Sequence, residues 1–317
     1  MKNKNLFLLL LLFIFLVGIV LTITGLVFGG RLYSYQIVSE DTISETDAYQ
    51  STPTTLSTKD ADSVKGIDFD IQTSAVNIVA GDNYSISGQG YYKSYVENGI
   101  WYVKTKSRKV HITFLNHTID IPYFWNHEEK YNINTITIPS DSNLDTADIK
   151  VSAGSLNGDK LSAKDIILKI GAGSLELNQI AAKDLHVKVG AGEAIFDNIT
   201  VTGSCNAKVG AGQIELGTEN VPSGVNTIAN LQGKCSAGEM DIVGKLTGNA
   251  DLDCSTGDLD LLLDGTRANY SIKSDSSLGD IDIDDDDDIL VSEKNNEHFG
   301  NLTLKCSLGG ISVEFQH

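Results

Sequence analysis

The chain has 317 residues, of which 41% are hydrophobic, enough for one or two domains with a packed core. Its 42 Asp and Glu outnumber its 24 Lys and Arg, and the formal net charge is -18. This balance argues against a nucleic-acid-binding protein, because phosphate binding needs a basic face. The 30 glycines and only four prolines suit a chain with many tight turns.

Residues 6–28 contain no charged side chain and lie between Lys4 and Arg31. A stretch of this length can cross a bilayer as one helix, and the lysines before it favour a cytoplasmic N-terminus. We therefore predict a cytoplasmic tail at 1–5 and a transmembrane anchor at 6–28. The predicted localisation is the cell membrane, as a single-pass protein with an extracellular C-terminal domain. A cleaved signal peptide is the alternative, although its apolar stretch is usually shorter, about 7–15 residues.

Residues 29–65 are rich in Ser and Thr and predict a flexible linker. Residues 66–148 form an irregular lead-in in which strand patterns alternate, and 11 of the chain's 23 aromatic residues lie between Tyr84 and Tyr131. We interpret these aromatic side chains as a cap over one end of the fold. The alternative is an exposed ligand patch, since aromatic faces bind sugars and proteins. That patch would consist of Tyr91, Tyr92, Trp101, Tyr123 and Trp125.

One short unit recurs through residues 149–317, and its clearest copies read Lys-apolar-small-Ala-Gly. Apolar and polar residues alternate before and after each glycine, which is the period of a β-strand. A unit of this size cannot bury its own apolar face, so we predict stacked rungs of about 19–20 residues in a β-solenoid, most simply a parallel β-helix. A β-sandwich is the alternative all-β fold. The repeated glycines, where the chain needs a small residue or a positive φ, are Gly154, Gly173, Gly192, Gly212, Gly238, Gly257, Gly279 and Gly309.

Charged residues recur at fixed places around these glycines. Lysines precede the glycine by four residues at Lys150, Lys169, Lys188, Lys208, Lys234 and Lys305. Carboxylates follow one or three residues after it at Glu176, Glu193, Glu215, Glu239, Asp241, Asp258, Asp260, Asp280 and Asp282. Stacked rungs would align these residues in a basic column beside an acidic one, where opposite charges relieve repulsion. We interpret the pattern as a solvated, striped face.

Four cysteines, Cys205, Cys235, Cys254 and Cys306, take positions where other units have aliphatic core residues. Cys235 and Cys254 would lie on adjacent rungs, close enough for a disulfide by distance. We predict free buried thiols instead, because neighbouring residues on parallel strands aim their side chains alike. No CxxC spacing supports zinc or redox chemistry.

No metal or cofactor site is predicted. The spacing of His111, His117 and His127 matches no known ligand motif. The acidic run at Asp280 to Asp288 lacks the glycines and the glutamate of known calcium loops. Asp284, Asp286 and Asp288 remain weak candidates for a divalent cation, beside the interpretation of a solvated loop.

The phrase Lys169-Ile170-Gly171-Ala172-Gly173, with Leu175-Glu176-Leu177 after it, resembles a bacterial family known as domain of unknown function 4097. Its members are described as candidate adhesins with β-strand repeats, and they often carry one N-terminal membrane helix. The similarity covers roughly residues 66–317, and the family supplies no catalytic residues. The resemblance implies a membrane-anchored extracellular scaffold that binds a cell-envelope protein or glycan.

Two other functions stay open at this point. Some relatives are associated with envelope-stress responses, so the chain could act through a partner within the membrane. A polysaccharide-degrading β-helix enzyme would need converging carboxylates, or a base with a bound cation. The acidic residues here are spread evenly along the repeats, and we predict no enzymatic activity.

Overall fold

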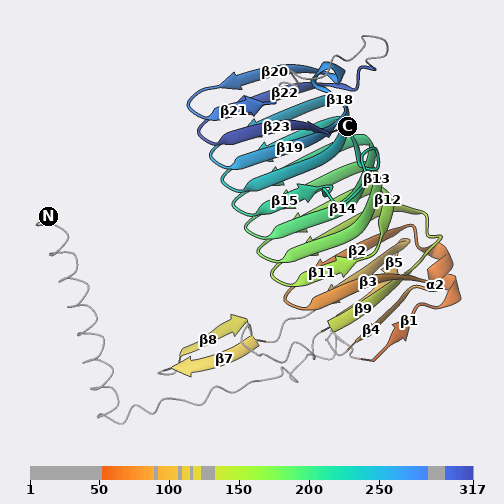
Figure 1. The fold of residues 1–317 in the computed structure, drawn as a ribbon. Helices are drawn as coiled ribbons and strands as arrows, with labels where there is room; N and C mark the ends of the chain where they lie inside the picture. Colours follow the sequence, from red (N-terminus) through yellow and green to blue (C-terminus); the bar gives the residue numbers. More distant parts are fainter. Residues whose placement is uncertain are drawn as a thin grey trace, which may run out of the picture. The chain divides into compact units, whose positions relative to one another are not determined.

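The computed structural model describes residues 52–88, 92–105, 109–114, 117–122, 133–284 and 297–316. These residues fall into two units. The smaller one is described as a hairpin of β7 (Lys109–Phe114) and β8 (His117–Pro122), which pair in antiparallel fashion. The larger one holds the repeats and is the all-β body of the chain (Figure 1).

The larger unit is a parallel β-solenoid, so the all-β solenoid part of the predicted fold is confirmed. Each rung has one arm before its glycine and one after it, and equivalent positions of successive rungs pair in parallel. In spatial order, the first arm consists of β6 (Ile100–Thr105), β2 (Gly66–Ile71), β10 (Leu144–Val151), β12 (Leu161–Ile170), β13 (Ser174–Val189), β14 (Glu193–Val209), β17 (Leu231–Cys235), β18 (Glu239–Cys254), β22 (Gly300–Cys306) and β20 (Tyr270–Ser276).

The second arm has the same parallel order on the other side of the glycines. It consists of β9 (Ile133–Pro139), β3 (Ala75–Gly81), β11 (Ser155–Gly158), the first halves of β13 and β14, β15 (Gln213–Leu216), the first half of β18, β19 (Asp258–Asp264), β23 (Gly310–Gln316) and β21 (Asp280–Ile283). β16 (Thr227–Ala229) fills a gap between β14 and β18. A single long strand such as β13 thus forms the second arm of one rung and the first arm of the next.

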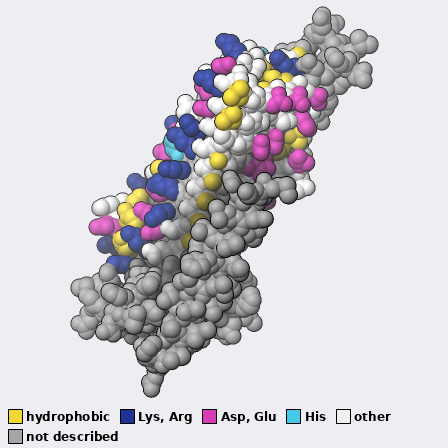
Figure 2. Space-filling model, turned by 90° about the vertical axis from the view of Figure 1, so that its left-hand side faces the viewer, with side chains coloured by type: hydrophobic (Ala, Val, Ile, Leu, Met, Phe, Trp, Pro, Cys, Tyr) yellow, Lys and Arg dark blue, Asp and Glu magenta, His cyan; other side chains and the backbone are white. Residues whose placement is uncertain are grey.

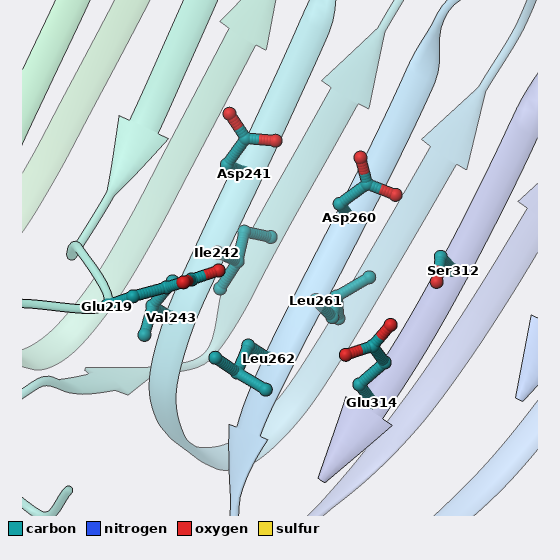
Figure 3. Close-up of a pocket in the computed structure, with 9 residues that line it drawn as sticks. All are labelled: Glu219, Asp241, Ile242, Val243, Asp260, Leu261, Leu262, Ser312 and Glu314. Carbon is teal, nitrogen blue, oxygen red and sulfur yellow. The ribbon is translucent and has the colours of Figure 1, made fainter. Parts of the chain in front are cut away.

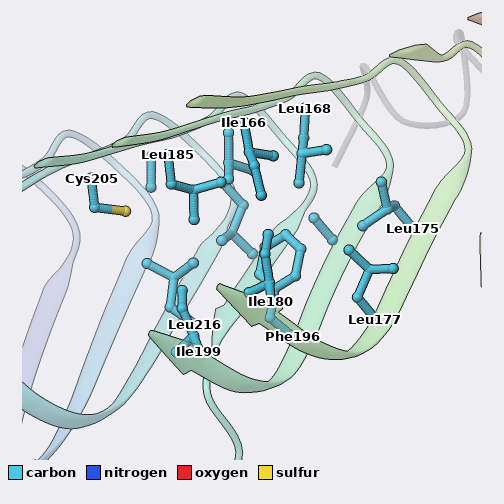
Figure 4. Packing of buried hydrophobic residues seen from close by; sticks show 14 of the residues in the cluster. Ile166, Leu168, Leu175, Leu177, Ile180, Leu185, Phe196, Ile199, Cys205 and Leu216 are labelled. Atoms are coloured by element: carbon cyan, nitrogen blue, oxygen red, sulfur yellow. The ribbon is translucent and has the colours of Figure 1, made fainter. Parts of the chain in front are cut away.

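The core lies between the arms and is built from the inward set of the sequence alternation. Leu168 and Leu185 of the first arm face Leu175 and Phe196 of the second, and all four are fully buried (Figure 4). Because each apolar column continues through the next rung, the core is one connected cluster from Ile67 to Val313. Stacking therefore provides the burial that a single unit lacks.

The repeated glycines form a sharp bend, called here the glycine corner, where the first arm passes into the second. None of these glycines has a positive φ. A Cβ at Gly212 would instead overlap the carbonyl oxygen of Gly192 on the preceding rung. That same oxygen accepts a hydrogen bond from the Gln213 amide at 3.0 Å. The corner needs glycine because adjacent rungs approach closely there, and of the two reasons expected from the sequence only the need for a small residue applies.

The last two rungs stack in the reverse of their sequence order. β22 and β23 come last in the chain, yet they pair with β18 and β19 on one side and with β20 and β21 on the other. The rung of β20 and β21 is therefore the outer one, at the blue end of Figure 1. Its half-buried Ile281 and Ile283 reflect this terminal position.

The other end of the solenoid carries a cap. β2 and β3 already form a complete rung in register with β10 and β11, so the ladder starts inside the predicted lead-in. Beyond this rung, β5 (Tyr92–Glu97), β4 (Ser85–Gly88) and β1 (Thr54–Thr55) add antiparallel strands. Trp101 packs edge-on against Phe69 and Tyr84 at 5.4 and 5.5 Å between ring centroids.

Within the predicted flexible linker, residues 29–65, the structure describes residues 52–65. Ser57 caps α2 (Thr58–Ser63) by accepting a hydrogen bond from the Asp60 amide at 3.2 Å. Leu56 packs against the core, and its amide donates to the Tyr84 carbonyl at 3.0 Å. These contacts attach the end of the linker to the cap.

The predicted localisation requires a correction. α2 has six residues, and no helix in the described part of the chain is long and apolar enough to cross a bilayer, which takes about 20 apolar residues. A single-pass anchor is therefore not supported, and the predicted membrane localisation is withdrawn. The tail at 1–5 and the predicted anchor at 6–28 lie outside the described residues.

Candidate functional site

The outward side chains of the second arm form an acidic face. Its three columns lie one, three and five residues after the glycine corner, and register aligns them across the rungs. Their carboxylates belong to Glu176, Glu193, Asp197, Glu215, Glu239, Asp241, Asp258, Asp260, Glu314, Asp280, Asp282 and Asp284. From Ser174 to Asp284, these three outward columns hold no Lys, Arg or His in the described chain.

A groove of about 370 Å³ crosses this face over β18, β19 and β23. Asp241 and Asp260 project from neighbouring strands on one side, with Glu219 and Glu314 at its ends (Figure 3). Val243 and Leu262 contribute apolar surface between these carboxylates. The groove thus combines negative charge with an apolar floor, which suits a positively charged ligand with an aliphatic stem.

Burial and mutual repulsion raise the pKa of three carboxyls on this face. Burial raises the pKa of Glu215, and Asp241 and Glu193 raise it further. Burial also raises the pKa of Asp241 against the lowering effect of a hydrogen bond from Gln213. Gln213 Nε2 donates to Glu215 Oε1 at 3.0 Å and to Asp241 Oδ2 at 3.2 Å, linking two rungs. The pKa of Asp260 is raised by burial and then by Asp258.

The sequence predicted these carboxylates as an aligned acidic column but did not single out a cluster within it. Glu239, Asp241 and Asp260 place carboxylate oxygens within 4.8 Å of one another. Oxygen donors of this kind suit a hard cation, although exposed acidic groups commonly gather without one. The predicted alignment of the repeats by their glycines does bring Asp241 beside Asp260, because the register follows the glycine corner.

The lysines before the glycine corner lie on the opposite side of it, on the first arm. Figure 2 shows Lys and Arg gathered mainly along one side, with several Asp and Glu among them, and a separate group of Asp and Glu on the other side. Lys169 pairs with Asp148 at 3.0 Å and Lys150 with Asp70 at 3.8 Å, both within the first arm. The expectation that these lysines relieve the repulsion within the acidic columns is therefore wrong, because the bend turns the lysines and the carboxylates onto different faces.

The structure removes two residues from the predicted aromatic patch. Tyr92 and Trp101 are both 0% exposed, and the Trp101 indole N–H donates to Ser94 Oγ at 2.8 Å inside the cap. They pack in the core and cannot present their faces to a ligand. Tyr91, Tyr123 and Trp125 lie outside the described residues, as do Asp286 and Asp288 of the predicted cation candidates. Asp284 is exposed at the end of the outer rung, where its amide donates to the Val313 carbonyl.

The four cysteines are free and buried, as predicted. Cys235, Cys254 and Cys306 lie in register on three successive rungs. Each thiol lies close to the carbonyl oxygen of the glycine three residues on, at 2.9 to 3.0 Å, which fits a weak S–H donor. Burial raises the pKa of Cys205 and of Cys254 to about 12, which disfavours the thiolate.

Fold and surface together define a parallel β-solenoid with charge-segregated faces. A family model named Toastrack DUF4097 matches residues 64–314. The chain therefore belongs to the Toastrack DUF4097 family, which confirms the resemblance seen in the sequence. A comparison with curated proteins finds no match.

Three solved structures are similar over most of the chain. A candidate cell adhesion protein from Clostridium sporogenes is 10% identical with a TM-score of 0.25, and the match covers 85% of this chain and 100% of that one. A candidate adhesin from Bacteroides fragilis is 12% identical with a TM-score of 0.44, over 84% and 98% of the two chains. A candidate lipid-binding protein from Parabacteroides distasonis is 12% identical with a TM-score of 0.38, again over 84% and 98%.

Proposed function

We propose that the chain is a non-enzymatic binding scaffold of adhesin type, whose acidic face holds a cationic partner at the cell envelope. One observation carries the proposal: the acidic columns run without a basic residue across the described second arm from Glu193 to Asp284. A rigid ladder spaces these carboxylates by about 4.8 Å from rung to rung. A lysine- or arginine-rich protein segment fits that spacing and charge.

The groove supports this choice of partner. Its carboxylates, Asp241, Asp260, Glu219 and Glu314, surround the apolar contribution of Val243 and Leu262. A lysine or arginine stem can cover the apolar floor while its charged end meets a carboxylate. Binding would also relieve the repulsion that contributes to the raised pKa of Asp241.

The same groove gives little basis for hydrolysis. A glycosidase needs two carboxyls whose surroundings push their pKa values apart, one protonated and one ionised. Here the pKa values of Glu215, Asp241 and Asp260 are all raised, with burial as the first cause in each. We therefore expect the purified chain to release no products from cell-wall glycans, and turnover of any of them would overturn the non-enzymatic assignment.

Binding to a lysine-rich peptide, measured by calorimetry at increasing salt, tests the proposal. We expect Asp241→Asn with Asp260→Asn to weaken binding about tenfold, equivalent to about 1.4 kcal/mol, and added salt to weaken binding to the unmodified chain. Asp62→Asn with Asp82→Asn is the matched control, since it removes two exposed carboxylates near the cap. Equal losses in both double variants would show that net charge, and not the acidic face, attracts the peptide.

An envelope-stress role through a membrane partner is the alternative. It depends on the segment 6–28, which lies outside the described residues. The features of the described solenoid give this role no specific support, so the binding scaffold is the function that we propose.

A further inference from the structure

A second surface, on the first arm, carries a run of positive charge that is paired with carboxylates only at its two ends. Lys169, Lys188, Lys208 and Lys234 occupy the same position on four successive rungs, and we call them the lysine column. All four are exposed. Parallel in-register pairing puts each ammonium group beside the next at about the rung spacing of 4.8 Å. Like charges aligned in this way repel one another.

The neighbouring column on the same face does not neutralise these lysines. Two residues before each lysine, the outward positions hold Ile167, His186, Asn206 and Gln232. None of these side chains is a carboxylate. The lysine column is therefore flanked by neutral or basic side chains throughout its four rungs.

Carboxylates pair with the lysine column only at its two ends. Lys169 meets Asp148 at 3.0 Å, and Lys234 meets Asp253 at 3.9 Å. Within the described chain, Lys188 and Lys208 form no ion pair. Asp184 lies farther from the corner. It already forms an ion pair with Lys183 at 3.2 Å and accepts a hydrogen bond from the Ser204 hydroxyl at 2.6 Å. The two central lysines are thus available to an anionic ligand.

We infer that the lysine column binds an extended, carboxylated polysaccharide that runs along the solenoid axis. Neighbouring sugars of an extended β-1,4-linked chain face opposite ways, so the carboxylates along one edge recur at about twice the rung spacing and can meet alternate lysines of the column. The amides of Asn206 and Gln232, joined at 3.1 Å, extend beside the lysines and can bind sugar hydroxyls. This ligand differs from the cationic partner of the acidic face, and the two surfaces lie on opposite sides of the glycine corner.

Calorimetry of the full chain with oligomannuronate, a β-1,4-linked uronic acid polymer, tests this inference. We expect binding that weakens with salt and that falls at least about tenfold in Lys188→Gln with Lys208→Gln. Lys59→Gln with Lys65→Gln, which removes two exposed lysines at the cap, is the matched control and should retain binding. Asp241→Asn with Asp260→Asn should also retain it, which separates this result from the test of the acidic face.

Three outcomes would overturn the inference. The first is no binding of oligomannuronate, or an equal loss in the two lysine double variants. The second is equal affinity for inorganic polyphosphate, which would show that charge alone is recognised. The third is equal affinity for neutral mannan, which would show that the lysines do not contribute to ligand recognition.

Discussion

Glycine at the corner avoids two clashes that a larger residue would make with the preceding rung. A Cβ at Gly192 would overlap the Gly173 carbonyl oxygen and would lie 2.9 Å from the Ile170 side chain of the preceding rung. The carbonyl is backbone and the isoleucine is fully packed, so neither can move aside easily. The neighbouring Ala191 is exposed and makes no such demand. In the Ala-Gly motif, the alanine position therefore has room for a side chain, whereas the glycine position does not.

Replacing one central corner glycine should destabilise the whole ladder. We expect Gly212→Ala to lower the free energy of unfolding by about 1–3 kcal/mol or more, since overpacking against fixed backbone has this effect. Ala211→Ser at the same corner is exposed and should change the free energy of unfolding by less than about 0.5 kcal/mol. Urea denaturation followed by circular dichroism compares the two, and a neutral Gly212→Ala would contradict the close approach of the rungs.

The cysteines behave as core residues with a weak hydrogen-bond donor. Cys235, Cys254 and Cys306 occupy the place that Val151, Ile170, Val189 and Val209 take on earlier rungs. Their sulfurs lie beneath the glycine of the following rung, as Cys235 does beneath Gly257. A thiol suits this space because it is small and can approach the corner carbonyl.

Thiol reactivity tests this interpretation. Cys205 and Cys254 are buried and their pKa values are raised to about 12, so almost no thiolate is present near pH 8. We expect the native chain to react with a disulfide reagent only slowly, at the rate of local or global opening. All four thiols should react at once in denaturant. Rapid reaction of one native thiol would show that its rung opens or that its burial is incomplete.

At the scale of the element, β15, β18 and β19 carry the three carboxyls of the acidic face whose pKa values are raised. The sign follows from linkage: the folded chain binds protons more tightly than the unfolded chain between the ordinary pKa and the raised one. This pH window begins at the ordinary pKa, which is 3.8 for Asp241 and Asp260 and 4.5 for Glu215. Stability from these groups is therefore lost as the pH rises through the window, and it returns on acidification.

Urea midpoints measured from about pH 8 down to about pH 4 should show this trend, because the window begins at the ordinary pKa values of 3.8 and 4.5. We expect the chain to gain stability as the pH falls into the window, and Asp241→Asn with Asp260→Asn to flatten the dependence. Asp145 and Asp184 have lowered pKa values through their partners Lys164 and Ser204, so they lose their contribution only below 3.8. Asp62→Asn with Asp82→Asn should keep the original slope. A steeper loss of stability on acidification would contradict the raised values.

The elements also show which features the sequence could predict. The alternation around Leu168 and Leu175 is a local property, so the strands, the inward set and the parallel stacking follow from it. The separation of Lys188 from Glu193 onto different faces depends on the bend at the corner, which residue spacing alone does not give. The burial of Tyr92 and Trp101 depends on pairing with distant strands, and aromatic composition alone suits a cap or a patch equally.

The order of the rungs is a property of the whole molecule. Ile281 and Ile283 of β21 and Ile311 and Val313 of β23 follow their glycines at the same spacing, so either strand could continue from β19. The sequence pattern therefore does not distinguish an order in which β21 follows β19 from one in which β23 does. In the structure β23 pairs with β19 and β21 pairs with β23, so the last segment of the chain lies between two earlier ones. Such an insertion makes the outer rung dependent on residues that follow it in the sequence.

Truncation distinguishes this order from the simple one. Removing residues 297–317 deletes β22 and β23, which supply all the described ladder pairings of β20 and β21 to other rungs. We therefore expect residues 270–284 to lose amide protection in hydrogen exchange although they remain in the chain, while β12 and β13 stay protected because both neighbouring rungs persist. Rungs stacked in sequence order would leave 270–284 paired to β18 and β19. Retained protection there would mean that the outer rung can dock on β18 and β19 directly, and would overturn the inserted arrangement.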